Sequence, residues 1–110
     1  MTNAIKTILS GKLTTYVYRT RTEMGKAAGT AAGEKLKELL AVKDEVNVIF
    51  AAAPSQNEML EALTSFPDID WTRVNGFHMD EYIGLPKDAP QGFGNFLRER
   101  IFKKLPFKNV

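Results

Sequence analysis

Residues 46–58 read VNVIFAAAPSQNE, and they set the architecture expected for the whole chain. The first eight residues form a near-continuous apolar run, which is typical of a central parallel strand covered on both faces. Pro54 ends the run, and Ser55 with Glu58 forms a capping-box pattern that predicts a helix to about residue 65. The stretch therefore predicts a strand, a short turn and a helix in direct succession.

Two further strands are predicted, one on each side of this unit. Residues 13–18, LTTYVY, are rich in β-branched and aromatic side chains, and residues 74–79, VNGFHM, form another apolar run. Residues 81–92 contain two prolines and two glycines, a composition too interrupted for a central strand or an ordinary helix. We therefore expect a loop after the third strand.

Helices are predicted in the remaining segments. Thr20 and Glu23 form a capping-box pattern ahead of a long amphipathic helix that reaches Leu40, and residues 95–104 have helical spacing that Pro106 closes. Three glycines fall on the apolar face of the long helix: Gly25, Gly29 and Gly33. Each costs a helix roughly 0.5–1 kcal/mol relative to alanine, so we expect the helix backbone to approach a sheet closely there.

Strands that alternate with helices predict an α/β fold, a three-layer αβα arrangement with a parallel Rossmann-like sheet. With about three strands and three helices, the arrangement is incomplete, and residues 1–110 are long enough for a single domain. Ligands of such sheets bind beyond the carboxyl ends of the strands. The segments that matter most are therefore residues 52–57 and residues 80–92.

Composition narrows the classes of function. Fifteen Lys and Arg residues against thirteen Asp and Glu leave a net charge of +2, too small for the basic surface of a nucleic-acid-binding protein. The chain has no cysteine and one histidine, His78, so it predicts no metal site and no cofactor, and catalysis would rely on carboxylates. No stretch resembles a membrane span or an export signal, which favours a cytoplasmic protein without a membrane partner.

The turn at residues 52–57 has two interpretations. The backbone N–H groups of Ser55, Gln56 and Asn57 would point outward at the positive end of a helix dipole and could bind an anion such as a phosphate. Alternatively, Ser55 caps the helix together with Glu58, which is the more common role of this pattern.

The segment after the third strand places two carboxylates side by side, Asp80 and Glu81. In extended geometry they point to opposite sides, so only one of them is expected to serve as an acid or base. His78 lies two residues before Asp80 and would share its face, where it could orient the Asp80 carboxylate. A structural histidine and a turn-capping aspartate are the alternatives.

Residues 77–86, FHMDEYIGLP, resemble the MDEYVGLP motif of the glucosamine-6-phosphate deaminase (isomerase) family. The similarity extends back through the second and first predicted strands and so covers most of the chain. It implies an enzyme that converts glucosamine 6-phosphate and water into fructose 6-phosphate and ammonia. Asp80 would be the general base that moves a proton between C2 and C1 of the opened sugar. The resemblance matches Ser55 to the family's phosphate loop and places Tyr82 in the same motif as Asp80. Together with the turn residues Gln56 and Asn57 and with His78, they are the candidate substrate-binding residues.

The chain departs from the family pattern at two places. The family's phosphate loop reads Ser/Thr-Gly-Gly-Ser/Thr, whereas residues 52–55 read AAPS, which removes both glycines and one N–H donor. His78 stands where the family commonly has asparagine. The chain is also less than half of the usual domain, so the resemblance implies an N-terminal fragment, one that is inactive alone and able to associate with another copy.

A non-catalytic module and a signalling receiver domain are the two alternatives to the enzyme. A non-catalytic phosphosugar-binding or regulatory module is favoured by the altered turn at residues 52–55. A signalling receiver domain needs an acidic cluster after its first strand, and residues 20–22, TRT, offer none. The basic residues between Arg98 and Lys108 are interpreted as cations that favour a helix C-terminus and solubility rather than as an anion-binding patch.

Overall fold

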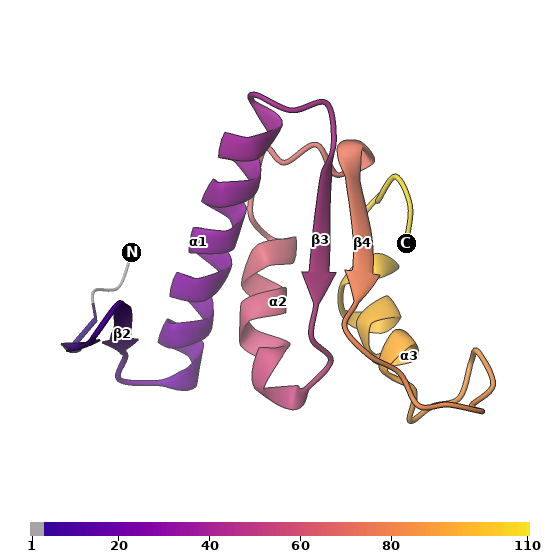
Figure 1. Cartoon of the computed structure of the whole chain (residues 1–110), viewed down its shortest axis with the longest axis horizontal. Helices are drawn as coiled ribbons and strands as arrows, with labels where there is room; N and C mark the ends of the chain where they lie inside the picture. The colour runs from indigo at the N-terminus through magenta and orange to yellow at the C-terminus, as the bar shows by residue number, and fades with distance from the viewer. Residues whose placement is uncertain (1–3) are drawn as a thin grey trace.

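The computed structural model describes residues 4–110, and the chain forms two separate two-stranded sheets with three helices (Figure 1). In chain order, the strands and helices are β1 (Lys6–Ser10), β2 (Leu13–Val17), α1 (Arg21–Leu40), β3 (Val46–Phe50), α2 (Asn57–Thr64), β4 (Val74–His78) and α3 (Phe93–Leu97). A π-helical turn, Arg98–Phe102, continues α3. No helix of residues 4–110 is long and apolar enough to cross a membrane.

The strands β3 and β4 form the parallel pair that the sequence predicts, with Val46 opposite Val74 and Phe50 opposite His78. Alternate residues of β3 point into the core, where Val46 and Phe50 are buried. The expectation that both faces of this strand are covered is wrong for residues 4–110. On the outer face the register partners Ile49 and Phe77 are 65% and 50% exposed, so the described helices supply only one covering layer.

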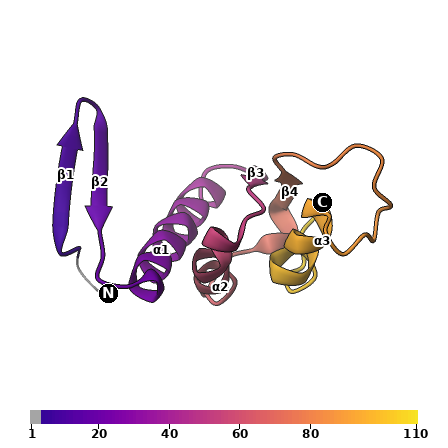
Figure 2. The ribbon, with the colours of Figure 1, turned by 90° about the horizontal axis from the view of Figure 1, so that it is seen from below.

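The predicted strand at residues 13–18 forms, but it does not join the parallel sheet. As β2, it pairs antiparallel with β1, and the resulting hairpin lies beside α1, on the side away from β3 and β4 (Figure 2). Gly11 adopts a positive φ of 59° in the two-residue turn between Ser10 and Leu13. Glycine adopts a positive φ without strain, so the chain can turn tightly here. The backbone hydrogen bonds of β2 are then made with its neighbour in sequence, β1.

The glycine face of α1 packs against α2 rather than against a sheet. A Cβ atom built on Gly25 would lie 2.3 Å from the Glu58 Cβ, and one built on Gly29 would lie 2.8 Å from the carbonyl oxygen of Met59. At Gly33 the nearest neighbour would be the ring of Phe66, at 2.5 Å.

Thr20 caps α1 as predicted, because its Oγ1 accepts a hydrogen bond from the Glu23 N–H at 3.1 Å.

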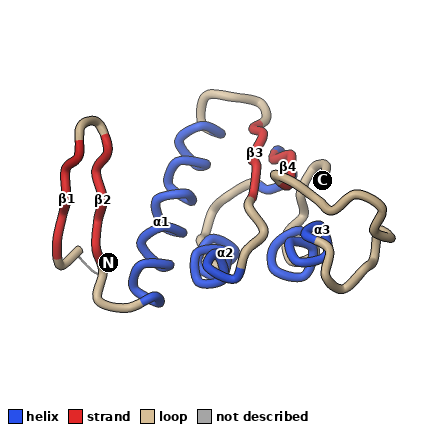
Figure 3. Tube along the Cα trace, turned by 60° about the horizontal axis from the view of Figure 1, so that its bottom comes forward, coloured by secondary structure: helices blue, strands red, loops and turns tan. Residues whose placement is uncertain are grey.

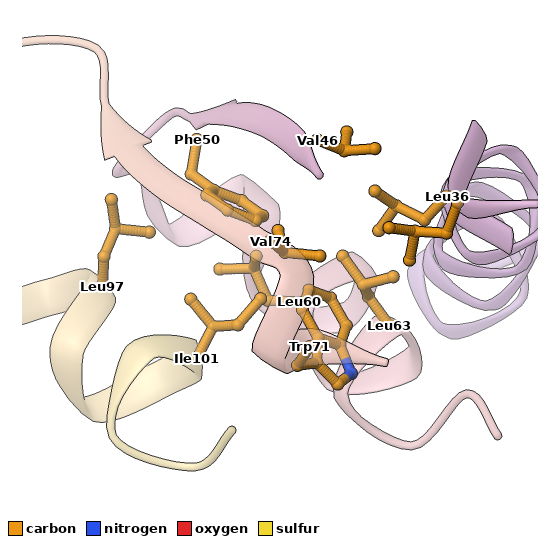
Figure 4. Close-up of a cluster of buried hydrophobic side chains, with 10 residues drawn as sticks. Leu36, Val46, Phe50, Leu60, Leu63, Trp71, Val74, Leu97 and Ile101 are labelled. Atoms are coloured by element: carbon orange, nitrogen blue, oxygen red, sulfur yellow. The ribbon is translucent and has the colours of Figure 1, made fainter. Parts of the chain in front are cut away.

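The hydrophobic core lies where α1, α2, α3 with its π-helical turn, and the inner face of β3 and β4 meet (Figure 4). Its fully buried side chains are Leu60, Leu63, Val74, Leu97 and Ile101. Phe107 then folds back onto this core, 4.9 Å from Trp71 between ring centroids. The last residues reach the edge of β4, where Asn109 forms a parallel bridge with Asn75.

Candidate functional site

The segments that follow β3 and β4 leave the sheet at the same edge, as expected for neighbouring parallel strands. The Met79 N–H donates a hydrogen bond of 3.0 Å to the Phe50 carbonyl, which ties the two strand ends together. From there, one segment turns directly into α2, while the other makes the long loop that returns to α3 (Figure 3). This edge is therefore the place to look for a ligand site.

The turn after β3 uses most of its own donors. Residues Pro54–Gln56 form a 3-10 turn in which the Gln56 N–H bonds to the Ala53 carbonyl at 2.9 Å and the Asn57 N–H bonds to the Pro54 carbonyl. The expectation that the Gln56 and Asn57 N–H groups point outward to an anion is therefore wrong. The prolyl nitrogen cannot donate, so a 3-10 turn consumes the donors that a glycine loop would leave free.

The predicted capping box at Ser55 and Glu58 does not form either. Helix α2 begins one residue later than that pattern implies, with Gln56 as its N-cap and no side-chain cap. Ser55 is exposed, and the Glu58 carboxylate instead accepts a 2.7 Å hydrogen bond from the Arg21 guanidinium. The same Arg21 side chain donates to the Pro54 carbonyl at 3.1 Å, so it anchors the turn from outside.

The end of β4 differs from the extended geometry assumed for residues 78–81. Nδ1 of His78 lies 3.0 Å from the backbone carbonyl oxygen of Asp80, so this nitrogen carries the hydrogen and donates it. The prediction that His78 orients the Asp80 carboxylate is wrong, because the strand ends at His78 and the chain turns there. Asp80 is exposed, and within residues 4–110 its carboxylate makes no hydrogen bond or ion pair.

Glu81, rather than Asp80, is the carboxylate with protein partners. It accepts backbone hydrogen bonds from Tyr82 at 3.0 Å, from Phe93 at 2.9 Å and from Gly94 at 2.8 Å. These donors stabilise the ionised form, and the N–H of Gly94 contributes most to lowering the pKa of Glu81 below its usual value. Glu81 is thus a charged anchor between the end of β4 and the start of α3.

A cavity of about 540 Å³ lies beside this anchor. Its lining includes His78 and Glu81, the loop residue Lys87, and Arg98 from the π-helical turn. Lys87 and Arg98 form no salt bridge with any residue of the described chain, so their charges are available to an anionic ligand. Asp80 and Tyr82 are not among the lining residues, and the ring of Tyr82 packs instead on Phe93 at 4.8 Å.

Sequence reasoning missed three of the cavity residues: Glu81 as an anchor, and Lys87 and Arg98 as cations. The basic residues near the C-terminus were interpreted together, but the structure gives them separate partners. Arg98 lines the cavity, whereas Nε of Arg100 donates to the Asn57 side chain at 2.8 Å. Lys108 forms an ion pair with Glu45, which lowers the pKa of that carboxyl. Among residues 4–110, no group of three or more acidic, histidine or cysteine side chains is placed to hold a metal ion.

Comparisons with curated proteins find glucosamine-6-phosphate deaminases. The protein of Streptococcus pneumoniae serotype 4 is 34% identical over 80 residues, which are 73% of this chain and 34% of that protein. The deaminase of Streptococcus sanguinis is 31% identical over the same share of this chain. The match therefore spans about a third of the length of these curated relatives, and no family model matches.

Solved structures with the same fold include 6-phosphogluconolactonases and a glucosamine-6-phosphate deaminase. A 6-phosphogluconolactonase from Shewanella baltica covers 84% of this chain with a TM-score of 0.76 at 16% identity, and the match is 40% of that chain. A monomeric glucosamine-6-phosphate deaminase of the NagB superfamily covers 83% with a TM-score of 0.69 at 18% identity, and the match is 36% of that chain. These likenesses confirm the α/β fold class, and the curated relatives confirm the resemblance first seen at residues 77–86.

Proposed function

Because this chain is a sequence relative of the glucosamine-6-phosphate deaminases, we propose that it forms part of a phosphosugar-processing site of that type. The proposed reaction converts glucosamine 6-phosphate and water into fructose 6-phosphate and ammonia. Residues 1–110 correspond in this proposal to the N-terminal portion of such an enzyme, which acts in the cytoplasm without a cofactor. The proposal rests on one observation: the motif at residues 77–86 begins at the carboxyl end of β4, the edge at which parallel sheets bind ligands.

Asp80 is the proposed general base. Removal of a proton from C2 of the opened sugar, and its delivery to C1 through an enolamine, needs a carboxylate within about 3 Å of the reacting carbon. The Asp80 side chain is exposed at the sheet edge and is not engaged by other described residues, so it is available to a ligand. Its backbone is fixed by His78, which gives the carboxylate a defined starting point.

Substrate binding is proposed to draw on both segments of the edge. The cations Lys87 and Arg98 give the cavity the charge that a phosphate requires. Side chains of Ser55, Gln56 and Asn57 from the turn, together with His78 and Tyr82 from the motif, are the proposed contacts to the sugar. For Asn57 this role would require sharing the Oδ1 atom that accepts from Arg100.

The experiment is ammonia release from glucosamine 6-phosphate by the full-length gene product, measured beside calorimetric binding of the same compound. Asp80→Asn should lower turnover on the order of 10²–10⁴-fold, the usual contribution of a general base, while binding persists. Asp88→Asn is the matched control, because it removes an equal charge from an exposed position of the neighbouring loop. Turnover by Asp80→Asn at the control's rate would refute the assignment of the base.

A non-catalytic phosphosugar-binding module is the second candidate. It is supported by the turn at residues 53–57, whose N–H groups at Gln56 and Asn57 are consumed internally, and by the absence of Asp80 from the cavity lining. In that case, calorimetry would detect binding of glucosamine 6-phosphate, and no ammonia would form with either the full-length gene product or its Asp80→Asn variant.

Self-association is part of the proposal as well. The outer face of β3 and β4 exposes Ile49, Phe77 and Met79, which are apolar side chains that a second copy of the chain would cover. Light scattering should then report a mass above that of one chain, and Phe77→Ser should reduce it. A monomer at all concentrations would exclude this contact.

A further inference from the structure

Glu81 caps a helix that has no cap of its own. The residue before α3 is Gly92, which has no side chain to accept the first N–H groups of the helix. Glu81 lies more than ten residues earlier in the chain, yet its Oε1 accepts from Phe93 and its Oε2 accepts from Gly94, the first two residues of α3. Unsatisfied N–H groups at a helix start normally find such an acceptor nearby in sequence. Here the acceptor is Glu81, which precedes the 82–92 loop, whereas α3 follows that loop.

The backbone is shaped to admit this carboxylate. A Cβ atom built on Gly94 would lie 3.2 Å from Oε2 of Glu81 and 3.6 Å from Cε1 of His78. Gly92 would likewise place a Cβ 3.5 Å from the same oxygen. Of these contacts, only the one between Gly94 and Glu81 is tighter than ordinary van der Waals distance, so the missing side chain of Gly94 leaves room for the Glu81 carboxylate at the start of α3.

Asp80 lies between these two fixed side chains, directly before Glu81. On one side, Nδ1 of His78 donates to the Asp80 carbonyl, and on the other, Glu81 is held by α3. The backbone of Asp80 is therefore restrained while its carboxylate stays unengaged among the described residues. We propose that Glu81 is a positioning residue, which fixes the Asp80 backbone and closes the 82–92 loop by capping α3. This inference rests on the proposed function, in which Asp80 is the base.

The chemistry of the anchor requires an ionised glutamate. Oε1 accepts hydrogen bonds from two N–H groups and Oε2 accepts one from a third, so both carboxylate oxygens of Glu81 act only as acceptors. A glutamine amide would direct an NH2 group at one of these donors, and an aspartate is one methylene too short for the same reach. The lowered pKa of Glu81 agrees with an anion stabilised by these donors.

The experiment compares Glu81→Gln with Asp88→Asn, both made in the full-length gene product. Amide hydrogen exchange and backbone NMR spectra are recorded for both variants, and turnover of glucosamine 6-phosphate is measured over a range of concentrations. In Glu81→Gln we expect exchange at Phe93 and Gly94 to accelerate about tenfold or more, as for the loss of a charged acceptor. The Asp80 resonances should shift, and kcat should fall on the order of 10²-fold with KM nearly unchanged, as for a displaced catalytic group. Asp88→Asn should leave all of these unchanged.

The possible outcomes distinguish a failure of the positioning role of Glu81 from a failure of the proposed enzymatic activity. If the full-length gene product shows no turnover, the proposed activity fails, while exchange at Gly94 and the Asp80 resonances still decide whether Glu81 holds this backbone. Unchanged exchange at Phe93 and Gly94 would overturn the cap. Faster exchange with an undisturbed Asp80 signal, or with an increase in KM alone, would overturn the positioning of Asp80.

Discussion

Replacement of Gly29 by alanine should force α1 away from α2. The added Cβ would lie 2.5 Å from the Ala62 Cβ, 2.8 Å from the Met59 carbonyl oxygen and 2.9 Å from the Leu63 nitrogen. Two of these neighbours are backbone atoms of α2, which no side-chain rotation can move. Alanine favours a helix over glycine by about 1 kcal/mol, whereas overpacking a tight contact costs about 1–3 kcal/mol. Because backbone must shift here, we expect the upper end of that cost and a net loss of about 2 kcal/mol.

The assay is urea unfolding followed by circular dichroism, with the free energy of unfolding taken from the midpoint and slope. Gly33→Ala is the informative comparison, because its Cβ would meet the Phe66 ring, a side chain that can turn aside. Gly33→Ala should therefore cost less than Gly29→Ala. An unfolding free energy for Gly29→Ala equal to or above that of the original chain would refute the packing of α1 on α2 through this glycine face.

Three further predictions concern the core, the anchor and the proposed base. Leu97→Ala removes a fully buried side chain and should cost about 2–5 kcal/mol in the same urea assay. The folded-state pKa of Glu81 is lowered, so its stabilisation is present above the unfolded pKa of about 4.3 and is lost as pH falls through the folded value. The difference between the urea midpoints at pH 6 and pH 3 should therefore be smaller in Glu81→Gln than in the original chain. Asp80→Asn should change the unfolding free energy by less than about 0.5 kcal/mol, because this side chain is exposed; a larger loss would reveal a structural role.

The elements that the sequence predicted well depend on neighbours within a few residues. The capping of α1 by Thr20 involves the N–H of Glu23, three positions away, and is visible as a pattern. The apolar runs of β3 and β4 likewise predicted strands whose ends agree with the structure to within a few residues. The motif at residues 77–86 could be placed at a strand end for the same reason.

The interpretations that failed depend on partners far apart in the chain. Glu58 bonds to Arg21 rather than to the turn before it, a separation of 37 residues. The glycine face of α1 correctly indicated a close approach, but the spacing of glycines carries no information about whether the partner is a sheet or a helix. The strand at residues 13–18 was assigned to the wrong sheet because period-2 patterns do not identify the neighbouring strand.

By itself, the amino-acid order determined the strand–turn–helix succession, the α/β class and the position of Asp80 after a parallel strand, because periodicity and capping are local properties of a chain. Only the tertiary structure decided that Glu81 reaches the start of α3, that Lys87 and Arg98 share a cavity with His78, and that the turn at Pro54 consumes its own donors. These features arise when segments distant in sequence are brought together by burial of Leu60, Leu97 and their neighbours. Hydrophobic burial is non-directional, so it can bring two distant segments into contact although neither segment's sequence indicates which other segment it will meet.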